Sequence, residues 1–294
     1  MKEALMDLME ELDFHQIDFH IHTNRSFDPW GRQDGTITLK EVIEDATKRG
    51  LLCIAVTDHW EPNTDPSIFL EERKEIDQAE TELKIFLSAE VEVLDIQGNT
   101  PVDLKDHREV LEKMDYLSAA PHLGELLPNT PYSLVGRRDI PRNKRGIIDY
   151  SQRQHMNLLK NELFDVILHP YEGTMAYLFR QGYSHTISFE YIPERYLEEF
   201  AEAAAFYEKA IEINNVSLAA EKAKEKGYEG FKQGCRLFVE KLIKAGTKLV
   251  VGSDSHHRND GWSWPGKTEE AVRIIRECGG DKKSLWLPRK RRLP

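Results

Sequence analysis

The sequence predicts an α/β barrel of seven βα units. Short apolar runs alternate with segments of helical periodicity along the whole chain, which is typical of parallel strands and their connecting helices. Histidine, aspartate or glutamate residues, which can bind metals or transfer protons, follow nearly all of these apolar runs. In a barrel every strand delivers its C-terminal residues to one shared face, whereas an open sheet gathers them at a single switch point. This distribution therefore favours a barrel.

The expected elements alternate in order along the chain. Strands are expected at 17–21, 51–56, 85–93, 116–120, 164–168, 211–213 and 248–251. Helices are expected at 38–49, 67–83, 105–113, 149–161, 193–209, 231–244 and 268–277. Local signals support several helix ends, because Thr38 and Glu41 form a capping box and Gly50 and Gly246 stand just past two helices.

Length and composition indicate one domain. A chain of 294 residues, 40% of them apolar, can bury a sizeable core, and no repeat, low-complexity tract or linker divides the sequence. We expect residues 1–294 to form a single barrel domain with its core at about 15–280. A short helical segment would precede this core and a basic tail would follow it.

Charge and cysteine content limit the partners and the compartment. The net charge of −11 argues against binding to nucleic acid or an anionic membrane and favours a small-molecule ligand. Three well-separated cysteines fit neither a disulfide framework nor a thiolate zinc site. No apolar run approaches ~20 residues and the acidic N-terminal segment is unlike a signal peptide, so we expect a cytoplasmic protein. The sequence does not predict the oligomeric state.

Histidines are concentrated where the expected strands end. In the first run, two-residue spacing puts Asp18, His20 and His22 on one face of the strand. Neutral imidazole with carboxylate oxygen is a ligand set suited to zinc, iron or manganese. The strand-end histidines are His20, His22, His59, His122, His169 and His256, and the acids near them include Glu90, Glu92 and Asp254.

Together these motifs resemble the polymerase and histidinol phosphatase (PHP) domain superfamily. The matching motifs are Asp18-Phe19-His20-Ile21-His22-Thr23 with Ser26, Ile54-Ala55-Val56-Thr57-Asp58-His59, the acidic third strand, His122, Ile167-Leu168-His169-Pro170, Glu212-Ile213-Asn214-Asn215 and Gly252-Ser253-Asp254-Ser255-His256. They span residues 18–256 in the family's order. The resemblance implies a distorted (βα)7 barrel with two to three divalent ions (Zn, Fe or Mn) at the C-terminal face of the strands.

The resemblance also implies a distribution of ligands. The implied sets are His20, His22, Glu90 and Asp254 for a first metal, Glu90, His122 and His169 for a second, and His59, Asp28 and His256 for a third. Asp28 stands where phosphatases of the family often carry a further histidine. We choose Glu90 over Glu92 because of the family's spacing to a following glycine. Asp18 and Asp58 are placed to orient the ligand histidines.

The implied activity is metal-dependent hydrolysis of small phosphomonoesters, in which a metal-activated hydroxide attacks phosphorus. Histidinol phosphate is the leading named substrate. Asp254, His256 or a metal-bound water would protonate the leaving group. Arg25 and Arg258, close to the ligand motifs, would clamp the phosphate, with Arg180 as a further candidate.

Three other functions stay open. The family also includes nucleases and proofreading phosphodiesterases that act on nucleotides or DNA ends, although the net charge of −11 counts against such an activity. A non-catalytic metal-binding barrel would have lost ligands, yet nearly every expected position is filled. A similar barrel could hydrolyse a carboxyl or amide bond, and such an enzyme would have less use for phosphate-clamping arginines.

Overall fold

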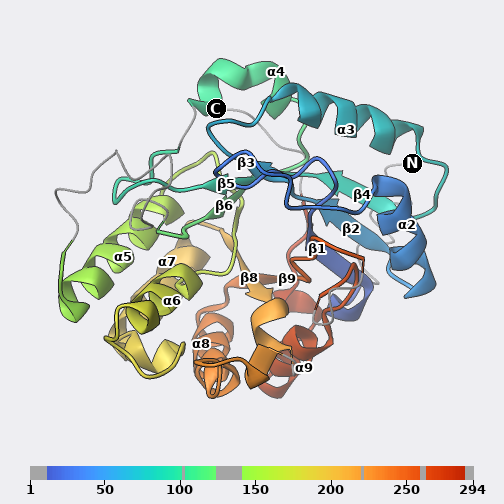
Figure 1. The fold of residues 1–294 in the computed structure, drawn as a ribbon. Helices are drawn as coiled ribbons and strands as arrows, with labels where there is room; N and C mark the ends of the chain where they lie inside the picture. The colour runs from blue at the N-terminus through green and yellow to red at the C-terminus, as the bar shows by residue number, and fades with distance from the viewer. Residues whose placement is uncertain (1–11, 101–102, 124–140, 220–221, 259–262, 289–294) are drawn as a thin grey trace.

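The structure is a computed structural model that describes residues 12–100, 103–123, 141–219, 222–258 and 263–288. Short parallel strands occupy the middle of the molecule and helices surround them (Figure 1). This is the distorted α/β barrel that the sequence predicts. The expected N-terminal helical segment and the basic tail lie largely outside the described residues.

The strands form two parallel sheets. They are β1 (Ile17–Ile21), β2 (Cys53–Val56), β3 (His59–Trp60), β4 (Lys84–Leu87), β5 (Glu90–Glu92), β6 (Ser118–Ala120), β7 (Val166–Ile167), β8 (Ala210–Asn214) and β9 (Lys248–Gly252). One sheet has the order β1-β2-β4 and the other has the order β3-β5-β6-β7-β8-β9. β1 and β8 are buried along their whole length, as expected for strands covered on both faces.

The expected strand at 85–93 is interrupted once, and the expected strand at 51–56 is followed after a break by the short β3. Residues 57–58 separate β2 from β3, and residues 88–89 separate β4 from β5. The breaks lie side by side, since the Ser88 amide donates to the Val56 carbonyl (2.9 Å) and the Glu90 amide to the Asp58 carbonyl (3.1 Å). β2 and β4 therefore leave the main sheet together. This shared break distorts the barrel and places Glu90 at the start of β5.

β1 and β9 meet at their C-terminal ends. The Asp254 amide donates to the His20 carbonyl (2.8 Å), and the His22 amide donates to the Ser255 carbonyl (2.9 Å). Asp18, buried in β1, accepts hydrogen bonds from the backbone of Ser253 (2.9 Å) and Gly266 (2.7 Å). The first and last strands are thus joined beside the candidate metal ligands.

Helices cover the outside of the strands (Figure 1). They are α2 (Leu39–Lys48), α3 (Ser67–Gln78), α4 (Arg108–Leu111), α5 (Lys144–Leu159), α6 (Glu172–Arg180), α7 (Glu194–Phe206), α8 (Phe231–Ala245) and α9 (Glu269–Glu277). The predicted capping box of Thr38 and Glu41 is confirmed, and Gly246 ends α8 in the left-handed region (φ 79°). Within the described residues, none of these helices has the length and hydropathy to cross a bilayer.

α6 was not predicted. It follows Tyr171, which has a left-handed backbone and makes no side-chain capping bond, so the usual sequence signal of a helix start is missing. The expected helix at 105–113 is also shorter than predicted, because residues 104–107 form a 3-10 turn before α4.

Candidate metal centre

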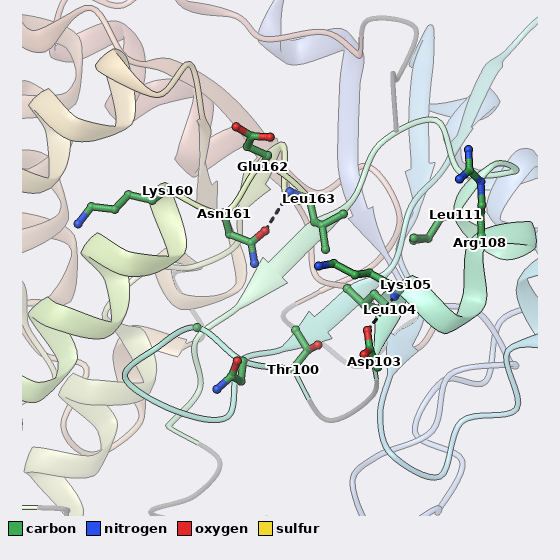
Figure 2. Close-up of a pocket in the computed structure, with 12 residues that line it drawn as sticks. Thr100, Asp103, Leu104, Lys105, Arg108, Leu111, Lys160, Asn161, Glu162 and Leu163 are labelled. Atoms are coloured by element: carbon green, nitrogen blue, oxygen red, sulfur yellow. Dashed lines mark hydrogen bonds between the residues drawn. The ribbon is translucent and has the colours of Figure 1, made fainter. Parts of the chain in front are cut away.

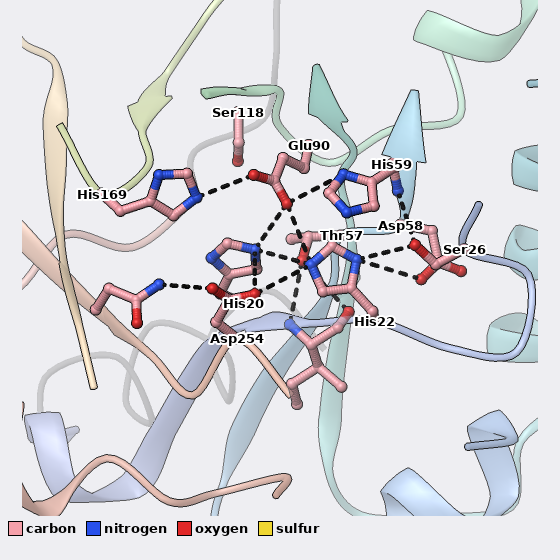
Figure 3. Close-up of polar contacts among 12 residues, drawn as sticks. His20, His22, Ser26, Thr57, Asp58, His59, Glu90, Ser118, His169 and Asp254 are labelled. Atoms are coloured by element: carbon pink, nitrogen blue, oxygen red, sulfur yellow. Dashed lines mark hydrogen bonds and ion pairs between the residues drawn. The ribbon is translucent and has the colours of Figure 1, made fainter. Parts of the chain in front are cut away.

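The strand ends bring the predicted histidines and acids together on one side of the barrel (Figure 3). Their nitrogen and oxygen atoms form groups within 4.8 Å of one another. The groups are His20, His22, Glu90 and Asp254; Glu90, His122 and His169; His22, His59 and His256; and His20, His169 and Glu212. All the predicted ligands except Asp28 belong to these groups.

Glu90 lies at the middle of the cluster. Its Oε2 faces His20 Nε2 (3.0 Å), His22 Nε2 (3.1 Å) and His59 Nδ1 (3.4 Å). Its Oε1 faces the other way, toward His169 Nε2 (2.9 Å) and His122 Nε2 (3.3 Å). One carboxylate thus presents one oxygen to each of two histidine sets, as a ligand that bridges two ions would do. Glu92 belongs to none of the metal-binding groups found among the described residues.

Asp254 completes the set around His20 and His22. The two Nε2 atoms lie 3.0 Å apart, and Asp254 Oδ1 is 3.5 Å from the first and 3.4 Å from the second. Asp254 has a left-handed backbone (φ 50°), and its Oδ2 accepts a hydrogen bond from Asn214 Nδ2 (3.0 Å). Nitrogen lone pairs that face each other beside a carboxylate suit a divalent cation.

Two carboxylates orient the candidate ligands from behind. His20 Nδ1 donates to Glu212 Oε1 (2.8 Å), and the other Glu212 oxygen accepts from the His169 amide (2.8 Å). Glu92 Oε2 lies 3.0 Å from His122 Nδ1. Such carboxylate–imidazole pairs fix the tautomer and orientation of metal-binding histidines. Glu212 reaches His20 because Gly252 has no side chain in its path.

This orienting role was assigned from the sequence to Asp18 and Asp58. Asp18 instead binds backbone amides that join β1 to the segment after β9. Asp58 accepts hydrogen bonds from the amide and hydroxyl of Thr23, both at 2.5 Å, and lies 4.0 Å from His22 Nδ1. Glu212 stood in a quoted motif, but its partner lies 192 residues away, so no local pattern could reveal the pair.

The structure does not bring Asp28 into the cluster. Asp28 is turned toward Arg32, whose amide and guanidinium bind its carboxylate (2.9 and 2.7 Å). An antiparallel bridge between Phe27 and Gln33 reverses the chain, and this reversal places Asp34, rather than Asp28, beside the histidines. Asp34 Oδ2 lies 3.3 Å from His59 Nε2, and Oδ1 lies 3.8 Å from the third-group histidine, His256. Asp34 carries no motif signal in the sequence and was not among the predicted ligands.

Two buried atoms in this third group test its fit to a metal ion. Asp34 Oδ1 and His256 Nδ1 have no hydrogen-bond partner in the described part of the chain. Buried polar atoms without partners are costly, and an ion would satisfy both. The mixed imidazole and carboxylate donors therefore fit a divalent cation here as well as in the first two groups.

The predicted phosphate-clamping arginines lie elsewhere. Arg25 makes a two-pronged ion pair with Glu75 (2.6 and 3.0 Å). Arg258 binds Asp45 on α2 through two nitrogens, both at 2.9 Å. The structure places Arg180 at the exposed end of α6. The Arg25 and Arg258 guanidinium groups are thus engaged by carboxylates of helices α3 and α2.

Charges in the cluster shift one another's protonation. Burial opposes a charged imidazole, but Glu92 and Glu90 raise the pKa of His122 to about 10. In the same way, Asp254 and Asp34 raise the pKa of His256 to about 10 despite burial. A metal ion must displace these protons, so metal binding will release protons and weaken as the pH falls.

A cavity of about 1010 Å³ lies away from this cluster (Figure 2). Its walls come from the segment that follows β5 and from the loop before β7. Figure 2 shows Lys105 between these walls and Lys160 turned outward. None of its lining residues belongs to the metal-binding groups.

The model of the PHP domain family matches residues 18–218, which is more than half of the chain. The chain belongs to the PHP domain family. A probable phosphatase of Thermoanaerobacter sp. strain X514 is 29% identical over 265 residues, covering 90% of this chain and 86% of that protein. A probable phosphatase of Caldanaerobacter subterraneus is 27% identical, with 89% and 82% covered.

A solved PHP-type structure has the same fold. Histidinol phosphate phosphatase from Lactococcus lactis, complexed with zinc, L-histidinol and phosphate, superposes with a TM-score of 0.60 at 18% identity. The match covers 90% of this chain and 94% of that one. The resemblance stated from the sequence is therefore confirmed at the level of family and fold.

Proposed function

We propose that this PHP protein is a metal-dependent hydrolase of small phosphomonoesters that holds two to three divalent ions. The observation that carries the proposal is Glu90, whose two oxygens face separate sets of histidines. The proposed ligands are His20, His22, Glu90 and Asp254 for one ion, Glu90, His122 and His169 for a second, and His59, His256 and Asp34 for a third. Zinc, iron and manganese all suit these donors.

Ions bound at such a centre lower the pKa of water and neutralise charge on a phosphoryl group. The protein's residues orient the ligand atoms: Glu212 fixes the orientation of the His20 imidazole, and Glu92 fixes that of His122. Three dications would outweigh the three ligand carboxylates, so a phosphate dianion needs no arginine there. The positive charge of the ions would therefore explain why Arg25 and Arg258 can bind carboxylates of the chain instead of the substrate.

The leaving group is proposed to receive its proton beside Asp254 and His256; as metal ligands these two would orient a proton-bearing water rather than carry the proton themselves. Their side chains are 19% and 26% exposed, whereas His20 and His22 are fully buried. The open side of the cluster is thus the side on which these two residues and His122, which is 33% exposed, lie. A substrate that approaches from solvent would meet them first.

The names of the relatives support phosphomonoesters as the substrate class. Curated relatives are called probable phosphatases, and the solved Lactococcus lactis enzyme holds L-histidinol and phosphate. Histidinol phosphate is accordingly the first substrate to test. The net charge of −11 disfavours a long polyanion such as DNA but does not oppose a small phosphate.

A substrate panel tests the proposal. Purified protein loaded with zinc, iron or manganese is assayed against histidinol phosphate, sugar phosphates, nucleotides and single-stranded DNA. We expect phosphate release from at least one monoester, loss of turnover in Asp254→Ala, and no change in the control His15→Ala, whose side chain is 66% exposed. Turnover of DNA alone would replace the proposal with a nuclease. No turnover of any substrate by the metal-loaded protein would refute it.

A further inference from the structure

The turn after β7 has an unusual backbone. His169 and Tyr171 both have positive φ, 26° and 66°, although neither is glycine. Side chains at such positions are strained unless the surroundings hold them in place. The residues that hold this turn therefore decide where the His169 imidazole points.

His155, on α5, holds the turn from behind. Its imidazole is fully buried, and Nε2 accepts a hydrogen bond from the Tyr171 amide (3.0 Å). Its Nδ1 donates to the Ser151 carbonyl within the same helix (2.8 Å), which fixes the tautomer that leaves Nε2 free to accept. The His155 and Tyr171 rings also stack, with centroids 4.1 Å apart and planes at 7°.

Further contacts make the Tyr171 position rigid. The Tyr171 hydroxyl donates to Gln152 Oε1 (2.5 Å), one turn before His155 on the same face of α5. The ring packs edge-on against Phe200 and Phe238 from the next two helices of the layer. The turn is thus fixed to α5 at the amide, the ring and the hydroxyl of a single residue.

The same turn carries one histidine of a metal-binding group and packs against the backbone of the other. His169 Nε2 lies 2.9 Å from Glu90 Oε1. Gly173, two residues beyond Tyr171, packs so closely on the His122 backbone that an added Cβ would lie 2.6 Å from its carbonyl oxygen. A shift of the turn would therefore move His169 directly and His122 through this contact.

We propose that His155 is a positioning residue for the group formed by Glu90, His122 and His169. In the described part of the chain its hydrogen bonds and ring contacts go to Ser151, Tyr171 and Phe200, so it acts on the group through the Tyr171 amide. This inference rests on the proposed assignment of that group as a metal site. A buried histidine that only stabilises the core would affect all of the metal-binding groups equally, whereas a positioning residue affects this one selectively.

The test measures metal affinity, not turnover. Zinc binding to the full chain is measured by competition with a chromophoric chelator, with total zinc content measured after dialysis. His155→Phe keeps the ring stacking but cannot accept from the Tyr171 amide, and we expect one bound equivalent to weaken roughly 10- to 100-fold. His155→Gln can donate to the Ser151 carbonyl and accept from the Tyr171 amide, so it should restore most of that affinity.

Three controls separate the outcomes. Leu159→Ala, a buried apolar change on the same helix, should lower stability without selective loss of one equivalent. Combining His155→Phe with His122→Ala should add little to the loss from His122→Ala alone, whereas combining it with His256→Ala should give additive losses. Wild-type protein that binds no metal would refute the proposed function itself. Unchanged zinc binding by His155→Phe, or an equal loss in Leu159→Ala, would overturn the positioning role alone.

Discussion

Replacing Asp34 by alanine should remove one metal equivalent, whereas replacing Asp28 should not. The two aspartates lie six residues apart on the same loop and are therefore a matched pair. Asp34 lies 3.3 Å from His59 Nε2 and 3.8 Å from His256 Nδ1, while the Asp28 carboxylate is bound by Arg32.

The size of the effect follows from the charge that is lost. A carboxylate about 4 Å from a dication interacts by about 8 kcal/mol at an effective dielectric constant near 20. The Asp34 side chain is 23% exposed, so solvent screens part of this energy, and water replaces the lost ligand, so we expect a net loss of about 3 kcal/mol. At roughly 1.4 kcal/mol per factor of ten, zinc affinity at the third site should fall by about a hundredfold.

Chelator competition with Asp34→Ala, Asp34→Asn and Asp28→Ala measures this directly. The asparagine variant keeps the shape and removes the charge, so it should resemble the alanine variant. Asp28→Ala should bind zinc like the wild type. Loss of a metal equivalent in Asp28→Ala, with none in Asp34→Ala, would show that the loop is arranged as the sequence resemblance implied and would refute our assignment.

Three further predictions concern groups around the centre. Glu212→Gln should weaken zinc binding roughly 10- to 100-fold, because the charge that orients His20 is lost; wild-type affinity would leave Glu212 a structural role only. Arg258→Met should lower Tm by about 2–4 °C, because the ion pair with Asp45 is lost, yet leave KM for phosphomonoesters within about twofold. A tenfold rise in KM would show that Arg258 contacts the substrate. Burial lowers the pKa of His155 from 6.5 to about 4, so stability present above pH 6.5 should decline toward pH 4 by about 3 kcal/mol relative to His155→Gln. Equal pH slopes in urea unfolding would contradict this.

Local patterns explain why much of the centre could be predicted. The alternation of side chains along a strand is enough to place His20 and His22 on one face, and the structure brings their Nε2 atoms within 3.0 Å. Parallel strands deliver their ends to one side of a barrel, so His122 and His169 could be expected near Glu90. These inferences need only periodicity and topology.

The parts that were missed depend on loop shape and on distant partners. Asp34 enters the cluster because the chain reverses between Phe27 and Gln33, a conformation that no periodic pattern specifies. Glu212 orients His20 only because β8, β9 and β1 are neighbours in the folded barrel. The carboxylate partners of the arginines were missed for a similar reason: nearness in sequence to a ligand says nothing about acids such as Asp45 that compete for the guanidinium.

The junction between β1 and β9 has a consequence for how the protein folds. The Asp18 carboxylate and the Ser253 amide are 235 residues apart in the chain, so this contact must form against a large loop-closure entropy. His20 and Asp254, which flank the junction, cannot become neighbours before it closes. A metal ion that binds both would hold the ends of β1 and β9 together and slow their separation, so proteases should cut the metal-free protein faster than the metal-bound protein.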